Sequence, residues 1–404
     1  MAKRGIESLG ELKGKRVLVR VDFNVPLKRG ADGSQQVADD YRLEAALPTI
    51  RRLSEAGARV VLMSHLGRPK GEPKPELSLA PVAARLAELL GSPVAFCPET
   101  VGAAAQAAAS ELAEGGVLVV ENLRFHKGEK KNEPEFAAAL AALGELYVND
   151  AFGVCHRAHA SVAAVTEHLP SACGLLIERE VEALGPLRDG SAARPLVVVL
   201  GGAKLGTKIP VLEALIPRTD AILVGGGMAY TLLKAQGKPI GGSKVEDDLL
   251  DTATQILESA RTRAREQGCQ LVLPHDHVVA AGLDDLTGYD VVEEVPSNRM
   301  ALDVGPASLA EFVQVLRTAK TVFWNGPLGV FEQPPFHLGT HYVASFLAGR
   351  QGDCRTIVGG GDSAAAARQL GLADAMDWVS TGGGASLLYV QGEDLPGLDA
   401  LPEA

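Results

Sequence analysis

The sequence predicts two α/β domains of the doubly wound, Rossmann-like type, each with a parallel sheet covered by helices. Short apolar, β-branched runs alternate along the whole chain with longer Ala/Leu/Glu-rich stretches. The short runs are apolar throughout, as strands covered on both faces should be. The chain has 404 residues, which exceeds the ~250–300 residues at which a single hydrophobic core stops growing. Two domains are therefore expected.

The expected elements follow one another in regular alternation. The predicted strands of the first half are Arg16–Val21, Arg59–Met63, Pro93–Phe96, Val117–Val120 and Leu146–Val148. Those of the second half are Pro195–Leu200, Ala221–Val224, Gln270–Leu273, Thr321–Trp324, Arg355–Val358 and Trp378–Val379. Periodicity predicts helices at Leu79–Leu90, Pro134–Leu143, Asp247–Gln267, Ser308–Arg317 and Ser363–Gln369. The segment Lys28–Gln36 is expected to be a flexible surface loop.

The two domains are expected to be joined by a helix. We predict a first domain over residues 1–175, a connecting helix over 176–189 and a second domain over 190–389. The tail, residues 390–404, is too short to fold alone, and we expect it to return to the first domain. A hinge is predicted near Glu178–Gly185 and near Ser380–Leu388, because two ligands held on two domains must be brought together.

Composition and charge exclude several classes of protein. The formal net charge of −11 argues against a nucleic-acid or anionic-membrane binder, which needs a positive surface. The segment Met1–Leu9 has no apolar core, so no signal peptide is expected, and no apolar run approaches ~18 residues. The cysteines form no C-x-x-C pair, which fits a reducing cytoplasm better than a disulfide or zinc framework. They are Cys97, Cys155, Cys173, Cys269 and Cys354.

Glycine-rich turns follow four predicted strands of the second half. Ligands of open parallel sheets bind beyond the carboxyl ends of the strands, and glycine lets the backbone approach a ligand closely. Four such turns in one half indicate a nucleotide-type ligand there. The turns are Gly201–Gly202, Gly225–Gly227, Gly359–Gly361 and Gly382–Gly384.

Two of these turns carry charged residues. The string GGAKLGTK fails the Walker A pattern because Gly206 is followed by Thr207. Lys204 and Lys208 nevertheless suit the neutralisation of a polyphosphate. In GGGDSAA, Asp362 is interpreted either as a helix cap or as a ligand of Mg²⁺ beside a phosphate site. This string also matches a loose dinucleotide pattern, but no acidic residue follows at the end of the next predicted strand.

Basic and polar residues follow the predicted strands of the first half. Arginine suits the bidentate recognition of phosphate and carboxylate groups. If these strands are neighbours, the side chains converge at one sheet edge and favour a small substrate with several negative charges. The histidines near them lack the spacing of a zinc site. The residues are Asp22, Asn24, Arg42, His65, Arg68, Arg124 and Arg157.

Taken in order, these strings resemble the phosphoglycerate kinase family over nearly the whole chain. They are VRVDFNVP, SHLGRP, ENLRFHKGE, VNDAFG, HRAHAS, GGAK, GGGMA, FWNGPLGVFE, GGGDSAA and STGGGAS. The resemblance implies a glycolytic enzyme that exchanges 1,3-bisphosphoglycerate and ADP with 3-phosphoglycerate and ATP. It also implies the use of Mg²⁺, a monomer, and no nucleic-acid or membrane partner.

The resemblance also implies which residues form the two binding sites. The first domain would bind phosphoglycerate through Asp22, Phe23, Asn24, Arg42, His65, Leu66, Gly67, Arg68, Arg124 and Arg157. The second domain would bind the nucleotide through Lys204, Lys208, Gly226, Gly227, Ala301, Leu302, Asn325, Val330, Glu332, Gly360, Gly361, Asp362 and Ser363. Arg42 and Lys208 would be catalytic, and Asp362 would hold Mg²⁺.

The sequence departs from the usual family pattern at four positions, and two other functions compete. Thr207, Arg299, Ala301 and Leu388 differ from the usual residues, which bears on nucleotide affinity and on the hinge. A nicotinamide-dependent dehydrogenase would need an acidic residue that binds ribose after its glycine turn. A non-catalytic nucleotide-binding protein would be expected to lose Lys208, Asp362 or the arginines.

Overall fold

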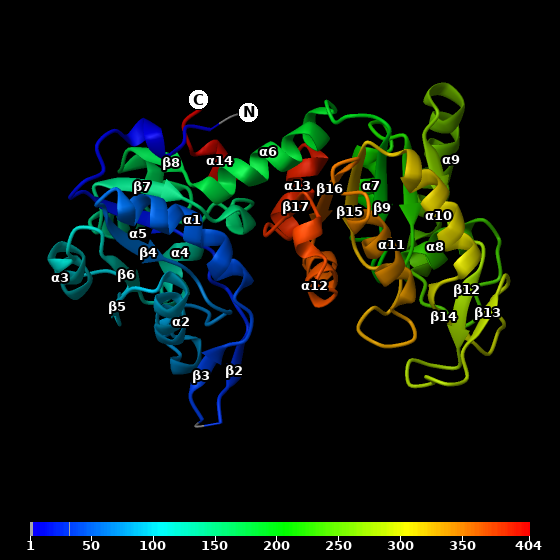
Figure 1. The fold of residues 1–404 in the computed structure, drawn as a ribbon, viewed down its shortest axis with the longest axis horizontal. Coiled ribbons are helices and arrows are strands. Elements are labelled where there is room, and N and C mark those ends of the chain that lie inside the picture. Colours follow the sequence, from blue (N-terminus) through cyan, green and yellow to red (C-terminus); the bar gives the residue numbers. More distant parts are fainter. Residues whose placement is uncertain (1–2, 32) are drawn as a thin grey trace. The chain divides into compact units, whose positions relative to one another are not determined.

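The computed structural model describes residues 3–31 and 33–404, which fold into two compact units (Figure 1). Unit 1 consists of Met1–Gly185 together with Asp394–Ala404, and unit 2 of Pro186–Glu393. The border between the units lies inside helix α6, Leu175–Asp189. Residues 1, 2 and 32, which fall in the expected N-terminal domain and in the expected loop Lys28–Gln36, lie outside the described residues.

Unit 1 is built on a six-stranded sheet in the order β5-β6-β4-β1-β7-β8. All neighbouring strands are parallel. The strands are β1 (Arg16–Arg20), β4 (Arg59–Met63), β5 (Val94–Cys97), β6 (Val117–Val120), β7 (Leu146–Asn149) and β8 (Ser171–Cys173). The inner strands are buried almost throughout, as expected of strands covered on both faces.

The helices of unit 1 cover this sheet. The first of them, α1, buries Leu43, Ala46, Leu47, Ile50 and Leu53, the i, i+3, i+4, i+7 spacing of an apolar helix face. The α-helices are α1 (Tyr41–Glu55), α2 (Ala80–Leu90), α3 (Ala103–Glu111), α4 (Lys127–Lys131), α5 (Pro134–Ala141) and α14 (Pro396–Asp399). The 3₁₀ helices are η1 (Ile6–Leu9), η2 (Pro75–Leu77), η3 (Leu123–Phe125), η4 (Phe152–Val154) and η5 (Ala164–Glu167).

The end of the chain packs on unit 1, and α14 lies near β8 in Figure 1. The backbone N–H of Gly397 donates to the carbonyl of Cys155 at 2.8 Å, and Arg4 donates to the carbonyl of Pro402 at 2.9 Å. Leu398 and Leu401 are buried. Apolar burial and backbone hydrogen bonds therefore tie the last residues to the first ones.

The expected loop Lys28–Gln36 is instead a short antiparallel hairpin. Strand β2 (Leu27–Arg29) pairs with β3 (Gln35–Val37), with Leu27 opposite Val37. Both strands are short and only partly buried, so their apolar pattern is too weak to predict them.

Unit 2 is built on a second six-stranded sheet in the order β11-β10-β9-β15-β16-β17. All its neighbouring strands are again parallel. The strands are β9 (Leu196–Leu200), β10 (Ala221–Val224), β11 (Gln270–Val272), β15 (Thr321–Asn325), β16 (Arg355–Gly359) and β17 (Trp378–Val379). The predicted α/β class, with two units on parallel sheets, is confirmed.

The helices of unit 2 follow the strands in alternation. They are α7 (Ile209–Leu215), α8 (Met228–Ala235), α9 (Leu250–Gln267), α10 (Pro306–Thr318), α11 (Leu338–Ala348), α12 (Gly361–Gln369) and α13 (Gly384–Gln391). Two 3₁₀ turns, η6 (Asp247–Leu249) and η7 (Ala373–Ala375), precede α9 and β17. Among the helices of the described chain, none combines the length and apolar character needed to cross a bilayer.

A small antiparallel sheet was not predicted from the sequence. Its order is β13-β12-β14, with β12 at His277–Ala280, β13 at Asp290–Val292 and β14 at Met300–Val304. The pairing of β12 with β14 shifts register between Val278 and Val279. Short strands with such an irregularity give no clear alternation in the sequence.

The fully buried Asp150 gives a first testable prediction. Its Oδ1 accepts the N–H of Leu176 at 2.9 Å, whereas Oδ2 is buried without a partner. Burial raises the pKa of Asp150 from 3.8 to about 7. Between these values the folded state binds the extra proton, so this carboxyl lowers the free energy of unfolding as pH rises.

We therefore compare the free energy of unfolding of Asp150→Asn with that of the unchanged protein. Between pH 5 and pH 8 this difference should shift by about 2–3 kcal/mol in favour of Asp150→Asn. Urea unfolding of both proteins at the two pH values measures this. A stability difference that is the same at both pH values would contradict the assignment.

Candidate active site

The carboxyl ends of four consecutive strands bring polar side chains to one edge of unit 1. Strands β6, β4, β1 and β7 are neighbours and parallel, so the segments that follow them leave the sheet on the same side. Asp22 and Asn24 follow β1, His65 and Arg68 follow β4, Arg124 lies in η3 after β6, and Arg157 follows β7. From the sequence, these side chains were expected to converge if their strands were neighbours. The strands are neighbours in the sheet.

Asp22 links two of the other predicted residues. Its Oδ2 lies 2.6 Å from Nη1 of Arg42, which is in the first turn of α1. Its Oδ1 lies 3.9 Å from Nδ1 of His65. Asp22 therefore orients the Arg42 guanidinium beside the end of β1.

The loop after β4 is held from both sides. The N–H of Gly67 donates to Oδ1 of Asn24 at 2.9 Å, and Nη1 of Arg124 donates to the carbonyl of Gly67 at 2.7 Å. Asn122 accepts the N–H groups of Leu66 and Arg124 at 3.2 and 3.0 Å. Gly67 has φ +62°, which favours glycine. These bonds fix the Arg124 side chain against the loop.

Positive charge accumulates at this edge. Burial, followed by the charges of Arg20, Arg124, Arg42 and Arg157, holds the pKa of His65 well below its usual value. Burial, followed by Arg20 and Arg157, lowers the pKa of Arg124 to about 10. Cations that depress one another in this way are stabilised by a bound anion. We call Arg42, His65, Arg68, Arg124 and Arg157 the basic face.

Not every predicted residue has a side chain in the basic face. The side chains of Phe23 and Leu66 are buried in the core, and their N–H groups donate to Ser64 and Asn122. Arg68 is exposed, and within the described chain no hydrogen bond or ion pair of its guanidinium is found. Arg157 is exposed and donates from Nε to His156 Nε2 at 2.9 Å. Arg68 is therefore grouped with the basic face only because it follows β4.

A buried polar network beneath the basic face was missed by the sequence reasoning. Arg20, Glu129 and Ser161 are each fully buried. Nε of Arg20 donates to Oγ of Ser161 at 2.9 Å, and Oγ of Ser161 donates to Glu129 at 2.7 Å. A charged residue inside the apolar run VLVRVDF could have revealed Arg20, because an arginine is rarely fully buried without a partner.

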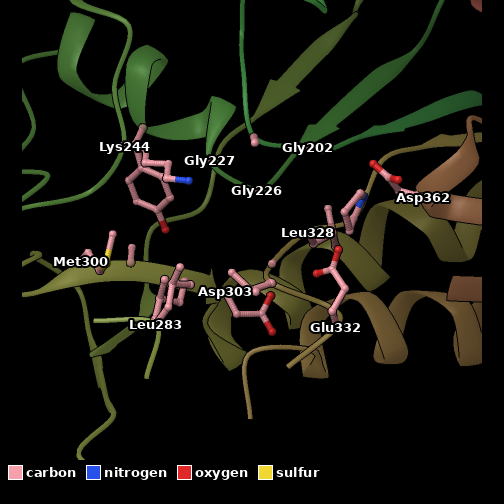
Figure 2. A pocket seen from close by; sticks show the side chains of 17 residues that line it. Gly202, Gly226, Gly227, Lys244, Leu283, Met300, Asp303, Leu328, Glu332 and Asp362 are labelled. Carbon is pink, nitrogen blue, oxygen red and sulfur yellow. The ribbon is translucent and has the colours of Figure 1, made fainter. Parts of the chain in front are cut away.

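In unit 2 a pocket opens at the ends of the strands (Figure 2). It has a cavity volume of about 260 Å³ and is lined by both apolar and polar groups, as small-molecule sites usually are. Among its lining residues are seven of those predicted, namely Gly226, Gly227, Ala301, Leu302, Val330, Glu332 and Asp362. Figure 2 shows Lys244 at one end of the pocket, Asp362 at the other and Glu332 between them.

Two apolar stretches line the pocket, one in β14 and one after β15, and a backbone hydrogen bond joins them. Val330 donates from its N–H to the carbonyl of Leu302 at 2.9 Å. Ala301 donates to Oγ of Ser243 at 3.0 Å, so β14 is fixed on its other side. The sequence reasoning missed Tyr230 and Lys244, which also line the pocket, because no motif marks them.

The Asp362 side of unit 2 gathers three of the predicted polar residues. Nζ of Lys208 donates to Oδ1 of Asn325, and Nδ2 of Asn325 donates to the carbonyl of Gly359 at 2.7 Å. Burial lowers the pKa of Lys208, and the charge of Asp362 opposes that shift. A lysine ammonium that is half-buried beside one carboxylate favours a bound polyphosphate.

Helix α12 presents its N-terminus here. Gly360, with φ +91°, is the N-cap, and Asp362 lies in the first turn rather than at the cap. The interpretation of Asp362 as helix cap is therefore wrong. The first N–H groups of a helix lack intrahelical partners and favour phosphate. Oγ of Ser363 accepts the N–H of Gly326 at 2.5 Å, so it braces the turn after β15.

The glycines of the turns serve two different purposes. A Cβ on Gly226 would lie 2.7 Å from backbone atoms of Gly202, and one on Gly201 would lie 2.0 Å from the carbonyl oxygen of Pro327. Nothing lies within 4 Å of a Cβ on Gly361. Gly201 and Gly226 therefore permit backbone packing, whereas Gly361 leaves space in front of α12.

The remaining predicted residue of this set, Lys204, is exposed in the turn after β9. Thr207 donates from Oγ1 to the carbonyl of Lys204 at 3.0 Å, which shapes the same turn. Neither Lys204 nor Lys208 lines the pocket in Figure 2. No cluster of three or more His, Cys, Asp or Glu side chains that could hold a metal ion is found among the residues described.

These features together define a class of protein. A cationic face on one α/β unit suits a small anion, and the other unit offers an apolar pocket next to a lysine, a carboxylate and a helix N-terminus. Such a pair of sites is typical of a nucleotide-dependent phosphotransferase.

Comparisons with known proteins give the family. The family model described as phosphoglycerate kinase matches residues 6–393. Phosphoglycerate kinases of Synechococcus elongatus and Anaeromyxobacter dehalogenans are 49% and 51% identical, each over 100% of both chains. A solved phosphoglycerate kinase structure from Coxiella burnetii is 40% identical with a TM-score of 0.85 and covers 98% of both chains. One from Pyrococcus horikoshii is 31% identical with a TM-score of 0.82 and the same coverage.

The chain belongs to the phosphoglycerate kinase family. It is therefore a glycolytic kinase, an enzyme that transfers a phosphoryl group between ATP and 3-phosphoglycerate. The predicted family, enzyme class and function are confirmed.

The close packing at Gly226 gives a second prediction. Gly226→Ala would force a Cβ onto the backbone of Gly202 at φ +68°. We expect it to lower the free energy of unfolding by about 1–3 kcal/mol and to deform the pocket. Urea unfolding and the thermal shift produced by Mg-ADP measure the two effects.

Gly282→Ala is the matched control, since nothing lies within 4 Å of its Cβ and it neighbours the pocket residue Leu283. Equal stability and equal Mg-ADP shifts in both variants would show that the close approach at Gly226 is not required.

Proposed function

We propose that the basic face of unit 1 binds 3-phosphoglycerate and that the pocket of unit 2 with α12 binds Mg-ATP. The predicted first domain, residues 1–175 with the tail 390–404, would have the first role, and the predicted second domain, residues 190–389, the second. The observation that carries the proposal is the arrival of polar side chains, four of them from the basic face, at the carboxyl ends of four neighbouring parallel strands. Family membership supplies the identity of the substrates.

The two ends of phosphoglycerate differ in chemistry. Asp22, Asn24 and Arg42 would hold the carboxyl end, where the phosphoryl group is transferred. The contact of 2.6 Å between Asp22 and Arg42 supports this, since it holds the guanidinium in one orientation. The phosphate that does not react would be bound by His65, Arg68, Arg124 and Arg157.

The nucleotide would lie along the pocket of unit 2. Gly226, Gly227, Leu302 and Val330 would surround the base, and Glu332 would bond the ribose. Lys204, Lys208 and Asn325 would contact the phosphates, with the first N–H groups of α12 below them. The support is that apolar Met300 and Leu283 lie at one end of the pocket and Asp362 at the other.

The reaction asks the protein for positioning and for charge neutralisation. The attacking carboxylate of phosphoglycerate is already an anion, so no general base is needed. Phosphoryl transfer then proceeds in line, with charge spread over the oxygens of the transferred group. Arg42 and Lys208 would neutralise that charge.

Mg²⁺ would be held by Asp362 together with phosphate oxygens of the nucleotide. Mg²⁺ prefers one or two carboxylates plus phosphate and water oxygens over an all-protein cage. A lone carboxylate in the first turn of α12 fits this preference. The ion would supply further neutralisation of the phosphate charge.

Three further properties remain proposals. Because the two substrates must meet, we infer that the units approach each other during turnover by bending near α6 and near Ser380–Leu388. We propose a monomer, as the family resemblance implies. All five cysteines are free and buried, which supports a reducing cytoplasm.

Lys208 provides the third prediction. We expect Lys208→Met to lower kcat for phosphoglycerate by about 10²–10³-fold, because it removes the cation beside the transferred group. A coupled assay with Mg-ATP and 3-phosphoglycerate measures this. Lys320→Met, which alters an exposed lysine of the same unit, serves as the control. If Lys208→Met kept a normal kcat, the catalytic role would be excluded.

Asp362 provides the fourth prediction. We expect EDTA to abolish turnover and excess Mg²⁺ to restore it. In Asp362→Asn, half-maximal activity should require roughly tenfold more Mg²⁺, because a charged ligand is lost. Titrating Mg²⁺ at saturating ATP tests this. An unchanged Mg²⁺ requirement would mean that Asp362 does not hold the ion.

A further inference from the structure

Arg20 lies directly below the basic face and contacts His65. It is the last residue of β1, is fully buried, and uses three of its nitrogens in hydrogen bonds. Nε donates to Oγ of Ser161 at 2.9 Å, Nη1 donates to the carbonyl of Val21, and Nη2 lies 3.0 Å from Nδ1 of His65. Arg20 was not among the residues expected to act in the site.

The direction of every bond in this network follows from the chemistry of arginine. A guanidinium has N–H donors and no acceptor. Oγ of Ser161 therefore accepts from Arg20, and its own proton goes to Glu129, whose Oε1 lies 2.7 Å away. The N–H of Ser161 donates to the other oxygen of Glu129 at 3.0 Å. The network thus ends on a buried carboxylate that balances the charge of Arg20.

The same rule fixes the protonation of His65. Since Nη2 of Arg20 can only donate, Nδ1 of His65 must accept and carries no proton. Oδ1 of Asp22 also faces Nδ1, but at 3.9 Å it is too far for a hydrogen bond. The single proton of the neutral ring is then on Nε2. Among the described residues no protein acceptor is found for this N–H.

We propose that Arg20 is a positioning residue that locks His65 as the Nε2–H tautomer, so that the basic face offers the substrate phosphate a neutral N–H donor. Its role in binding rests on the proposed function, whereas the tautomer itself does not. The neutral donor adds a hydrogen bond without adding a charge to the arginines around it. A protonated His65 would be repelled by Arg20, Arg42, Arg124 and Arg157, with Asp22 as the nearby anion.

The tautomer is measured directly on the unmodified protein without substrate. Long-range ¹H–¹⁵N correlation NMR on ¹⁵N-histidine-labelled protein distinguishes the two ring nitrogens, and loss of the signal in His65→Gln assigns it. We expect the pattern of an unprotonated Nδ1 and a protonated Nε2, constant from pH 5.5 to 8. A protonated Nδ1, or a ring that titrates in this range, would overturn the proposal.

Two variants test the contribution of the network to binding. Arg20→Lys keeps the charge but lacks the rigid fork that serves Ser161 and His65 together, and Ser161→Ala removes the link to Glu129. In either variant we expect a mixture of tautomers and a roughly tenfold rise in KM for 3-phosphoglycerate with a smaller change in kcat. KM should also become pH-dependent between pH 5.5 and 7, because His65 is then free to titrate.

Arg16→Lys is the matched control, because Arg16 lies at the other end of β1, where it faces Glu145. His65→Gln, whose amide N–H can reach the place of Nε2, should retain more substrate affinity than His65→Asn. An unchanged KM in a folded Arg20→Lys or Ser161→Ala variant would refute the positioning role. If His65→Asn keeps the substrate affinity of the wild-type protein, the proposed role of His65 in substrate binding fails, and the NMR result still decides the tautomer.

Discussion

In both units every strand of the six-stranded sheet runs parallel to its neighbours, and the rest of the structure depends on this constraint. Parallel pairing sends the ends of all strands to one edge, so residues far apart in the sequence meet there without long excursions of the chain. Strands β6, β4 and β7 bring His65, Arg68, Arg124 and Arg157 together in this way, and β1 adds Asp22 and Asn24. In unit 2, Asn325 at the end of β15 contacts Lys208 after β9, and Asp362 lies in the first turn of α12 after β16.

A parallel sheet also demands burial on both faces, and this makes charge at its centre costly. The sheet of unit 1 nevertheless carries Arg20 in β1, one of its two central strands. The cost is offset because Ser161 and Glu129 supply both the hydrogen bonds and the opposite charge. Through its bond to Nδ1, this fixed cation also orients His65. Under the proposed function, core packing and substrate recognition are coupled through this one side chain.

Much of this organisation could be predicted from the sequence, and the exceptions have physical causes. The strands at Arg59–Met63, Val117–Val120 and Ala221–Val224 were predicted to the residue, because fully buried strands are apolar throughout. The antiparallel sheet was missed because its three strands are short and one is irregular. Motifs identified the charged residues at strand ends. Tyr230 and Lys244 were missed because their place in the pocket depends on how β14 packs, which no local pattern records.

The return of the chain to unit 1 has a consequence for synthesis. All of unit 2 is made between Gly185 and Asp394, so unit 1 is interrupted by it in the sequence. On the ribosome, every strand of the unit 1 sheet is made before β9, the first strand of the unit 2 sheet, but unit 1 lacks α14 until unit 2 has been translated. Unit 2 can thus complete its fold before unit 1 does, although the unit 1 sheet is translated first.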